Sequence, residues 1–341
     1  MSLAEAAPVP QPADAILRAE NVTVSLSRAG RAMVSGVSFA VRRGELFGIA
    51  GESGSGKTLF TLATFGLHRE AEVTGGHVTF DGTRLFEDGR RSGGKRLLGR
   101  GIGFIPQDPY SSLNPSMRVG RQITEAIYLA RGIPPGSRRC RDEALALLAE
   151  VGIPEPETAF RQYPDQFSGG MRQRIVVAIA LSQEPALLIA DEPTTALDAF
   201  TQRRIVDLVV ERSRRRHLSV ILISHNLELL RQSVDRIAVL YSGQLLNVFG
   251  VGDLGQRELH PYTEALMSSV PRPDPRAEKK RIILEGEVAD PSNPPSGCYF
   301  HPRCQYAQGV CETETPKLRE LRDGHFVSCH RADELSLVGA M

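Results

Sequence analysis

The feature that most constrains this chain is a glycine-rich loop that directly follows an apolar run. The run Leu46–Ala50 leads into the loop, and a second apolar segment starts at Leu59. This order predicts a buried strand, a loop and then a helix, which is the context that the G-x-x-x-x-G-K-[ST] phosphate-binding pattern requires. The loop residues are Gly51, Glu52, Ser53, Gly54, Ser55, Gly56, Lys57 and Thr58.

The residue types of this loop suit a bound phosphate. Glycines let the backbone curl so that its N–H groups point inward, and the start of the following helix adds a partial positive charge. We expect Lys57 to reach the β- and γ-phosphates and the Thr58 hydroxyl to contact Mg²⁺. The alternative is a Gly/Ser surface turn that ends in Lys-Thr by chance, which the flanking strand and helix disfavour.

Size and charge limit the remaining possibilities. A chain of 341 residues suits a large α/β domain with something appended, and 41% hydrophobic residues can form its core. The formal net charge is +1, which gives no electrostatic reason to expect a nucleic acid as partner. No apolar run approaches the roughly 18 residues that cross a bilayer, so we expect a soluble or peripheral protein.

Changes in composition along the chain predict its organisation. Alternating apolar residues in Ile16–Leu26 and Val34–Val41 indicate an antiparallel hairpin about a turn at 27–31. Later the pattern is helical and without strand signals, which indicates a subdomain. We predict a disordered Ala/Pro-rich tail without a signal peptide at 1–15. A nucleotide-binding domain is predicted at 16–250, with a helical subdomain at about 108–167. An extension is predicted at 251–341, and it contains a stiff Pro-rich linker at 271–275.

A second group of polar residues follows buried strands. Asp191 and Glu192 come directly after the apolar run Ala186–Ala190, and ligands of open parallel sheets bind at the carboxyl ends of strands. Asp191 is predicted to hold Mg²⁺, and Glu192 to polarise the attacking water as general base. The alternative is an ordinary acidic pair on the surface.

Two further residues are ambiguous when taken alone. His225 ends the predicted strand Val220–Ser224, and a lone histidine is as often structural as functional. Gln107 follows the predicted strand Gly101–Ile105, where it could contact Mg²⁺ or water, or only cap a turn.

Together these residues resemble an ATP-binding-cassette (ABC) ATPase over roughly residues 16–250. The resemblance rests on the order and spacing of the phosphate loop, Gln107, a Ser-Gly-Gly-Met-Arg-Gln-Arg segment at 168–174, Asp191-Glu192, Ala196-Leu197-Asp198 and His225. It implies an α/β P-loop NTPase core with an antiparallel β subdomain, a helical subdomain and a small Cys-rich extension.

The resemblance also implies how the site is completed. Two cassettes pack head to tail, so that Ser168, Gly169 and Gly170 complete the partner's ATP site. By the same analogy, Gln107 couples Mg²⁺ and the γ-phosphate to the helical subdomain, and His225 holds the γ-phosphate and orients the water. The implied Mg²⁺ contacts are Thr58, Gln107 and Asp191.

Some positions depart from the commonest family pattern. The signature begins with Phe167 in place of Leu, and it carries Met171, which is usual in the peptide-transporter branch. The first hairpin has Leu26 where the family usually has an aromatic residue that stacks on adenine. Leu26 itself does not indicate which base is bound, so ATP as the nucleotide is implied only by the resemblance.

The tail narrows the resemblance to the ATPases of oligopeptide/dipeptide importers. The segment 260–266 and the Cys-rich segment 297–304 are similar to the C-terminal extension of that branch. Its four cysteines are Cys298, Cys304, Cys311 and Cys329, whereas Cys140 is alone in the helical region. Four thiolates can bind an iron–sulfur cluster or zinc, and resemblance to importers with a [4Fe–4S] cluster favours iron–sulfur over zinc and over free thiols.

The implied function is the ATP-hydrolysing subunit of an importer for peptides or a related solute. The implied partners are two membrane-spanning permease subunits, a related second cassette and an extracytoplasmic solute-binding protein, at the cytoplasmic face of the bacterial inner membrane. Opines, nickel chelates and glycosides use the same branch. Two alternatives are a soluble cassette ATPase of DNA repair or translation, and a purely regulatory nucleotide-binding module.

Overall fold

A computed structural model describes residues 12–26, 30–93, 101–193, 199–254, 259–269, 282–335 and 337. By its internal contacts the chain divides into two compact units. The first comprises Met1–Arg42, Phe47–Gly94 and Ser224–Met341, and the second comprises Arg43–Leu46 and Lys95–Ile223. Several sequence predictions lie outside the described residues, namely most of the 1–15 tail, residues 27–29 of the first turn, the 196–198 segment and the 271–275 linker.

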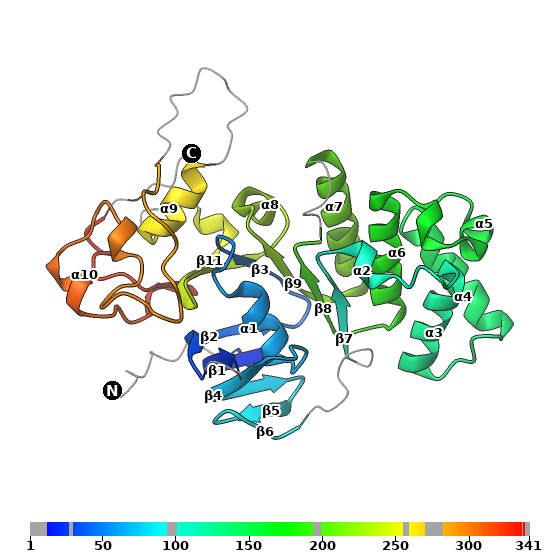
Figure 1. The fold of residues 1–341 in the computed structure, drawn as a ribbon, viewed down its shortest axis with the longest axis horizontal. Coiled ribbons are helices and arrows are strands. Elements are labelled where there is room, and N and C mark those ends of the chain that lie inside the picture. Colours follow the sequence, from blue (N-terminus) through cyan, green and yellow to red (C-terminus); the bar gives the residue numbers. More distant parts are fainter. Residues whose placement is uncertain are drawn as a thin grey trace, which may run out of the picture. The chain divides into compact units, whose positions relative to one another are not determined.

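An antiparallel sheet fills one side of the first unit (Figure 1). The predicted hairpin is confirmed, since Leu17 pairs with Val41 and Val24 with Val34. A two-residue strand at Arg90–Arg91 pairs with the strand before it, with Arg90 opposite Glu87. The strand order is β2-β1-β4-β5-β6, with β1 at Ala15–Leu26, β2 at Ala32–Arg42, β4 at Ala71–Phe80, β5 at Thr83–Glu87 and β6 at Arg90–Arg91.

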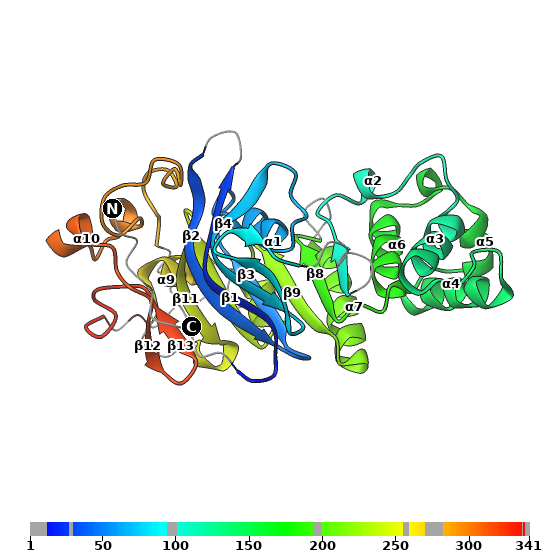
Figure 2. The same ribbon diagram turned by 90° about the horizontal axis from the view of Figure 1, so that it is seen from below.

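A second group of strands in the first unit begins with the strand of the phosphate loop. β10 pairs parallel to β3 and antiparallel to β11, and the extension adds two short strands beyond β11 (Figure 2). The order is β12-β13-β11-β10-β3. The bounds are Leu46–Ala50 for β3, Arg236–Tyr241 for β10, Gln244–Gly250 for β11, Arg319–Arg322 for β12 and His325–Val327 for β13.

Short helices complete the first unit. α1 follows the phosphate loop and packs against β4, with Phe60 and Ala63 buried. α9 lies in the extension and is capped by His260, whose side chain accepts from the Tyr262 N–H. The helices are α1 (Lys57–Thr64), α8 (Leu227–Arg231), α9 (Pro261–Ser268) and α10 (Gly309–Thr313), with 3₁₀ turns η2 (Val251–Asp253) and η3 (His301–Arg303).

The second unit combines three parallel strands with a group of helices. Its strands β9, β8 and β7 are apolar and almost fully buried, as expected of parallel strands with both faces covered. They span Ser219–Ser224, Leu187–Asp191 and Ile102–Ile105. The helices are α2 (Pro109–Ser112), α3 (Val119–Arg131), α4 (Arg138–Glu150), α5 (Pro156–Arg161), α6 (Gly169–Ser182) and α7 (Ala199–Arg216), with a 3₁₀ turn η1 (Pro164–Gln166).

The helical region has a core of its own. Ile123 and Ile127 of α3 and Leu148 of α4 are fully buried, which confirms the helical pattern predicted for this region. Cys140 belongs to this core, and the start of α4 is capped by the Ser137 hydroxyl, which accepts from the Cys140 N–H. Within the described ranges, no helix is long and apolar enough to span a membrane.

Candidate functional site

The phosphate loop has the strained, glycine-dependent backbone that a phosphate cradle needs. Gly51, Gly54 and Gly56 have φ angles of 150°, 81° and 94°. A Cβ on Gly51 would lie 2.3 Å from the carbonyl oxygen of Leu240, so the loop also passes close to β10. Other residue types would strain this backbone, because side chains disfavour positive φ.

The ammonium group of Lys57 lies inside the loop. Its Nζ donates to the carbonyl oxygens of Gly51 and Glu52, both at 2.9 Å, and the side chain is buried. Gly56 caps the start of α1, so Lys57 and Thr58 occupy its first turn. The cation and the helix N-terminus therefore combine in a site suited to an anionic phosphate group.

His225 belongs to the first unit and follows directly after β9. Its side chain is exposed. The next residue, Asn226, caps α8 by accepting from the Leu229 N–H at 3.0 Å. Capping of α8 therefore fixes the backbone beside His225.

The predicted acidic pair ends β8 in the second unit. Asp191 is buried with 4% exposure, whereas Glu192 is half-buried and has a φ of 40°. β7 runs parallel to β8, with Ile105 paired to Ala190, so Gln107 leaves the same edge of the strands as the two carboxylates. The structure thus places these three residues at one edge of one group of strands.

The signature segment, residues 168–174, begins a helix of the second unit. Ser168 is the N-cap of α6, and its hydroxyl accepts from the Met171 N–H at 3.4 Å. Gly169 and Gly170 are the first residues of the helix, and a Cβ on Gly170 would lie 3.0 Å from the Thr201 side chain of α7. Gly170 therefore allows a close approach of these two helices.

Two residues of the extension contact the phosphate loop in ways that sequence analysis did not assign. The N–H of Glu52 donates to the Tyr262 hydroxyl at 2.8 Å, and Arg303 forms an ion pair with the Glu52 carboxylate, also at 2.8 Å. Both residues stood inside the motifs of the tail, but nothing in the sequence places them beside residue 52. Leu26, the position expected near adenine, is half-buried at the end of β1.

The four cysteines of the extension line one small cavity of about 20 Å³. The N–H of Cys298 donates to the carbonyl oxygen of Cys311 at 2.8 Å, which brings two of the segments together. Burial raises the pKa of the Cys298 thiol to about 12 and that of Cys304 to about 11. His260, His301 and His330 also line this cavity.

The predicted metal centre is not formed as such. In the part of the chain that the structure describes, no three His, Cys, Asp or Glu side chains are grouped so that they could hold a metal ion. The convergence of four thiols on one cavity was predictable from the cysteine-rich segment, but the geometry of a metal site was not. Neither an iron–sulfur cluster nor zinc is supported by the placement of these side chains.

Comparisons with known proteins give the family. Residues 34–195 match the family described as ABC transporter, and residues 250–311 match the oligopeptide/dipeptide transporter C-terminal region. The dipeptide transport ATP-binding protein DppD of Bacillus subtilis is 41% identical over 94% of this chain and 95% of its own. DppD of Escherichia coli is 40% identical over 87% of this chain and 90% of its own.

Solved structures agree with this fold. A dimeric structure of the ATP-binding cassette MJ0796 with ADP and phosphate has a TM-score of 0.59 at 26% identity, covering 69% of this chain and 98% of its own. The structure of cbiO1 from Clostridium perfringens has a TM-score of 0.61 at 25% identity, covering 70% and 90%. With its phosphate loop, signature helix and matching tail, this chain belongs to the ABC transporter ATPases, in the branch that carries the oligopeptide/dipeptide transporter C-terminal region.

Proposed function

We propose that this protein is the ATP-hydrolysing subunit of an importer for dipeptides or oligopeptides. The observation that supports this most directly is that a formed phosphate loop and a peptide-transporter tail occur in one chain. The matches to the two relatives named for dipeptide transport cover at least 87% of this chain and 90% of each relative. They therefore include both the nucleotide-binding part and the tail. The match of residues 250–311 to a transporter region favours transport over a role in DNA repair or translation.

Each predicted residue takes a role in this proposal. ATP binds residues 51–58, with Lys57 on the β- and γ-phosphates. Bound Mg²⁺ would neutralise phosphate charge, and Thr58, Gln107 and Asp191 would hold it, since all three offer the oxygen ligands that it prefers. Glu192 takes the proton of the attacking water, and His225 orients that water.

The signature segment acts on a second cassette. Ser168, Gly169 and Gly170 present the start of α6, whose N–H groups suit the phosphates of ATP bound by a partner. We propose that this partner is a related second chain, so that the pair is a heterodimer. Binding of ATP closes the two cassettes, and hydrolysis opens them again.

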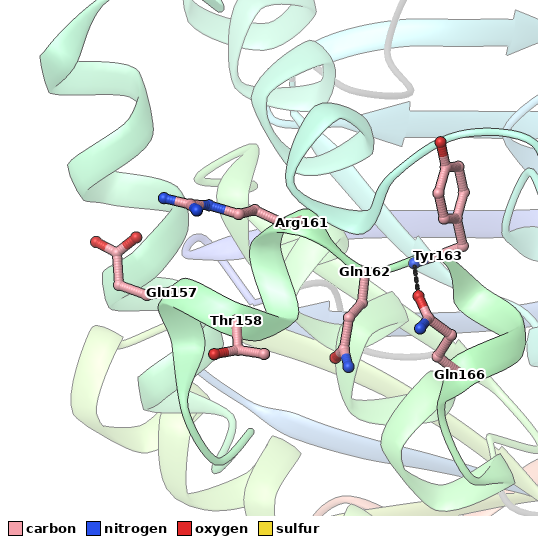
Figure 3. Close-up of a pocket in the computed structure, with 6 residues that line it drawn as sticks. All are labelled: Glu157, Thr158, Arg161, Gln162, Tyr163 and Gln166. Carbon is pink, nitrogen blue, oxygen red and sulfur yellow. Dashed lines mark hydrogen bonds between the residues drawn. The ribbon is translucent and has the colours of Figure 1, made fainter.

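The permease subunits require a docking surface on this chain. The second unit has a hollow of about 610 Å³ on its helical region, lined by α5 and the segment after it (Figure 3). Figure 3 shows Arg161, Tyr163 and Gln166 around this hollow, and Tyr163 is 41% exposed. We propose that a permease segment docks here, which places the chain at the cytoplasmic face of the inner membrane.

Transport by the assembled complex tests the proposal. The chain is co-expressed with its candidate permease, second cassette and solute-binding protein, and reconstituted in vesicles. Uptake of a labelled dipeptide or oligopeptide that depends on ATP supports the function. Uptake of an opine, a nickel chelate or a glycoside in its place would retain the ATPase but reject peptides as cargo.

We also propose that Cys298, Cys304, Cys311 and Cys329 bind an iron–sulfur cluster, with zinc as the alternative. The support is the donor set alone, because thiols are the ligands that such clusters use. The four thiols line one cavity, but they would have to draw closer together than they lie in this structure to hold a metal ion. Iron, sulfide and zinc are measured on anaerobically purified protein and on Cys304→Ser. About four iron and four sulfide per chain, lost in the variant, support the cluster, whereas zinc or no metal rejects it.

A further inference from the structure

Glu52 is the point at which the extension meets the phosphate loop, and it uses every polar group it has. Its carbonyl oxygen accepts from the Lys57 ammonium, and its N–H donates to the Tyr262 hydroxyl. Its carboxylate accepts from both terminal nitrogens of Arg303, at 2.8 and 3.4 Å. The backbone and the carboxylate of Glu52 are thereby both held by residues of the extension.

The Arg303 side chain is buried by residues around it as well as paired with the loop. Its side chain is 8% exposed, and its guanidinium carbon lies 5.8 Å from the centroid of the Tyr241 ring. Tyr241, Tyr262 and Phe300 are buried and pack edge to face or tilted, with centroids 4.8 to 5.3 Å apart. Such contacts hold the three rings in fixed orientations. Because the Arg303 guanidinium packs against the Tyr241 ring, its position is fixed as well.

The backbone that carries Arg303 is the one that carries two of the thiols. Arg303 ends the 3₁₀ turn η3, its N–H donates to the Phe300 carbonyl oxygen, and the Cys304 N–H donates to the His301 carbonyl oxygen. Cys298 and Cys304 stand on either side of this turn and line the same cavity. The position of Arg303 thus depends on the folding of the cysteine-rich segment.

We propose that Arg303 is a positioning residue for ATP binding, which neutralises the Glu52 carboxylate and holds it away from the phosphate cradle. A carboxylate in the loop opposes a polyanionic ligand unless a cation balances it. A bidentate guanidinium gives both the charge and a fixed direction. The extension therefore contributes to the affinity of the phosphate loop for nucleotide.

Calorimetric titration of the purified full-length chain with MgATP tests the role of Arg303. We expect Arg303→Ala to weaken ATP binding by about tenfold, because the lost charged hydrogen bonds leave Glu52 unbalanced. The double variant Arg303→Ala/Glu52→Gln should recover most of the affinity, since it has no charge to balance. Arg319→Ala is the matched control, because Arg319 pairs with Asp333 within the extension.

The melting temperature of each variant separates positioning from simple bracing. If Arg303→Ala lowers the melting temperature but leaves the Kd of ATP unchanged, the proposal is wrong and Arg303 only braces the fold. Failure of Glu52→Gln to restore affinity in the double variant would equally reject charge balance as the cause. Arg303→Lys keeps the charge without the bidentate geometry and provides a folded variant, which we expect to fall between wild type and Arg303→Ala. None of these outcomes depends on the transported solute.

Discussion

The backbone N–H of Glu192 donates a hydrogen bond to the carbonyl oxygen of Ile223, 3.0 Å away. This bond follows the pairing of Asp191 with Ile223 in the β8–β9 ladder, so Glu192 is held by the strands although it lies beyond the end of β8. Its φ of 40° then turns the chain sharply. Positive φ in a residue other than glycine costs free energy and is concentrated at functional positions.

The first prediction is that Glu192→Gln abolishes turnover but keeps ATP binding. The variant loses the general base while the backbone and Lys57 stay in place, so we expect ATP hydrolysis by the assembled complex to fall by at least about 100-fold. Binding of MgATP should change by less than about threefold, which calorimetry on the chain alone measures.

Glu211→Gln is the control for this change. Glu211 is exposed on α7 of the same unit and pairs with Arg215, so its variant should hydrolyse ATP normally. A Glu192→Gln variant that kept more than a tenth of normal turnover would remove Glu192 from the role of base.

Much of the fold was predictable because each element has a local cause. The buried strands β3, β8 and β9 are mostly apolar runs. Each is followed directly by residues that the sequence marks as functional, namely the phosphate loop, Glu192 and His225. The helix α6 begins where Ser168 can cap it. Local chemistry of this kind is readable along the chain.

Contacts between distant segments were not predictable. Arg303 and Glu52 are 251 residues apart, and no periodic pattern links them. The strands β12 and β13 are too short for a periodic pattern, and β12 is mostly charged. β13 pairs with β11 and β12 pairs with β13, so both depend on the edge of a strand that is distant in the sequence. The cysteines illustrate the same limit, since their number predicts a shared cavity but spacing does not fix whether they can hold a metal ion.

The second prediction concerns Gly51, whose replacement should close the phosphate loop. An added Cβ would lie 2.3 Å from the Leu240 carbonyl oxygen and 2.6 Å from the Ser55 hydroxyl oxygen. We expect Gly51→Ala to lower the free energy of unfolding by more than about 2 kcal/mol and to abolish detectable MgATP binding. Chemical denaturation and calorimetry measure the two effects.

Gly82→Ala separates the clash from backbone strain. Gly82 has a φ of 73° in the same unit, but its Cβ would meet nothing within 4 Å. Its variant should lose only about 1 kcal/mol and bind ATP normally. Equal losses in the two variants would show that strain alone, and not the crowded loop, explains the result.

The third prediction tests the hollow on the helical region. Tyr163 lines it, and the Tyr163 N–H donates to the Gln166 side-chain oxygen at 2.8 Å, which fixes the turn after α5. We expect Tyr163→Ala to weaken assembly with the permease by about tenfold, since partly exposed aromatic residues are frequent anchors of interfaces. ATP binding by the isolated chain should stay unchanged.

Tyr128→Ala is the matched control for the hollow. Tyr128 is 49% exposed on α3 of the same unit but does not line the hollow. Co-purification with the permease is measured for both variants. Weakened assembly in Tyr128→Ala but not in Tyr163→Ala would move the docking surface away from the hollow.

The fourth prediction is that one buried amide joins the extension to the nucleotide-binding part of the first unit. Asn247 of β11 is fully buried; its amide nitrogen donates to the Phe326 carbonyl oxygen at 2.9 Å. Its amide oxygen accepts from the His260 N–H and the Thr263 hydroxyl, both at 3.1 Å. The amide nitrogen also lies 3.3 Å from the His325 Nε2. Asn247→Ala removes all of these contacts, so we expect a loss of about 3 kcal/mol in the free energy of unfolding.

Limited proteolysis shows which part of the first unit the Asn247→Ala change destabilises. Because Asn247 links β11 to α9 and β13, cleavage in the variant should begin within the extension, before the rest of the first unit is cut. Asn293→Ala, at an exposed position of the extension, should be cleaved like the wild type. Simultaneous cleavage throughout the first unit would instead show that the extension and the nucleotide-binding part unfold as one, and that Asn247 stabilises both equally.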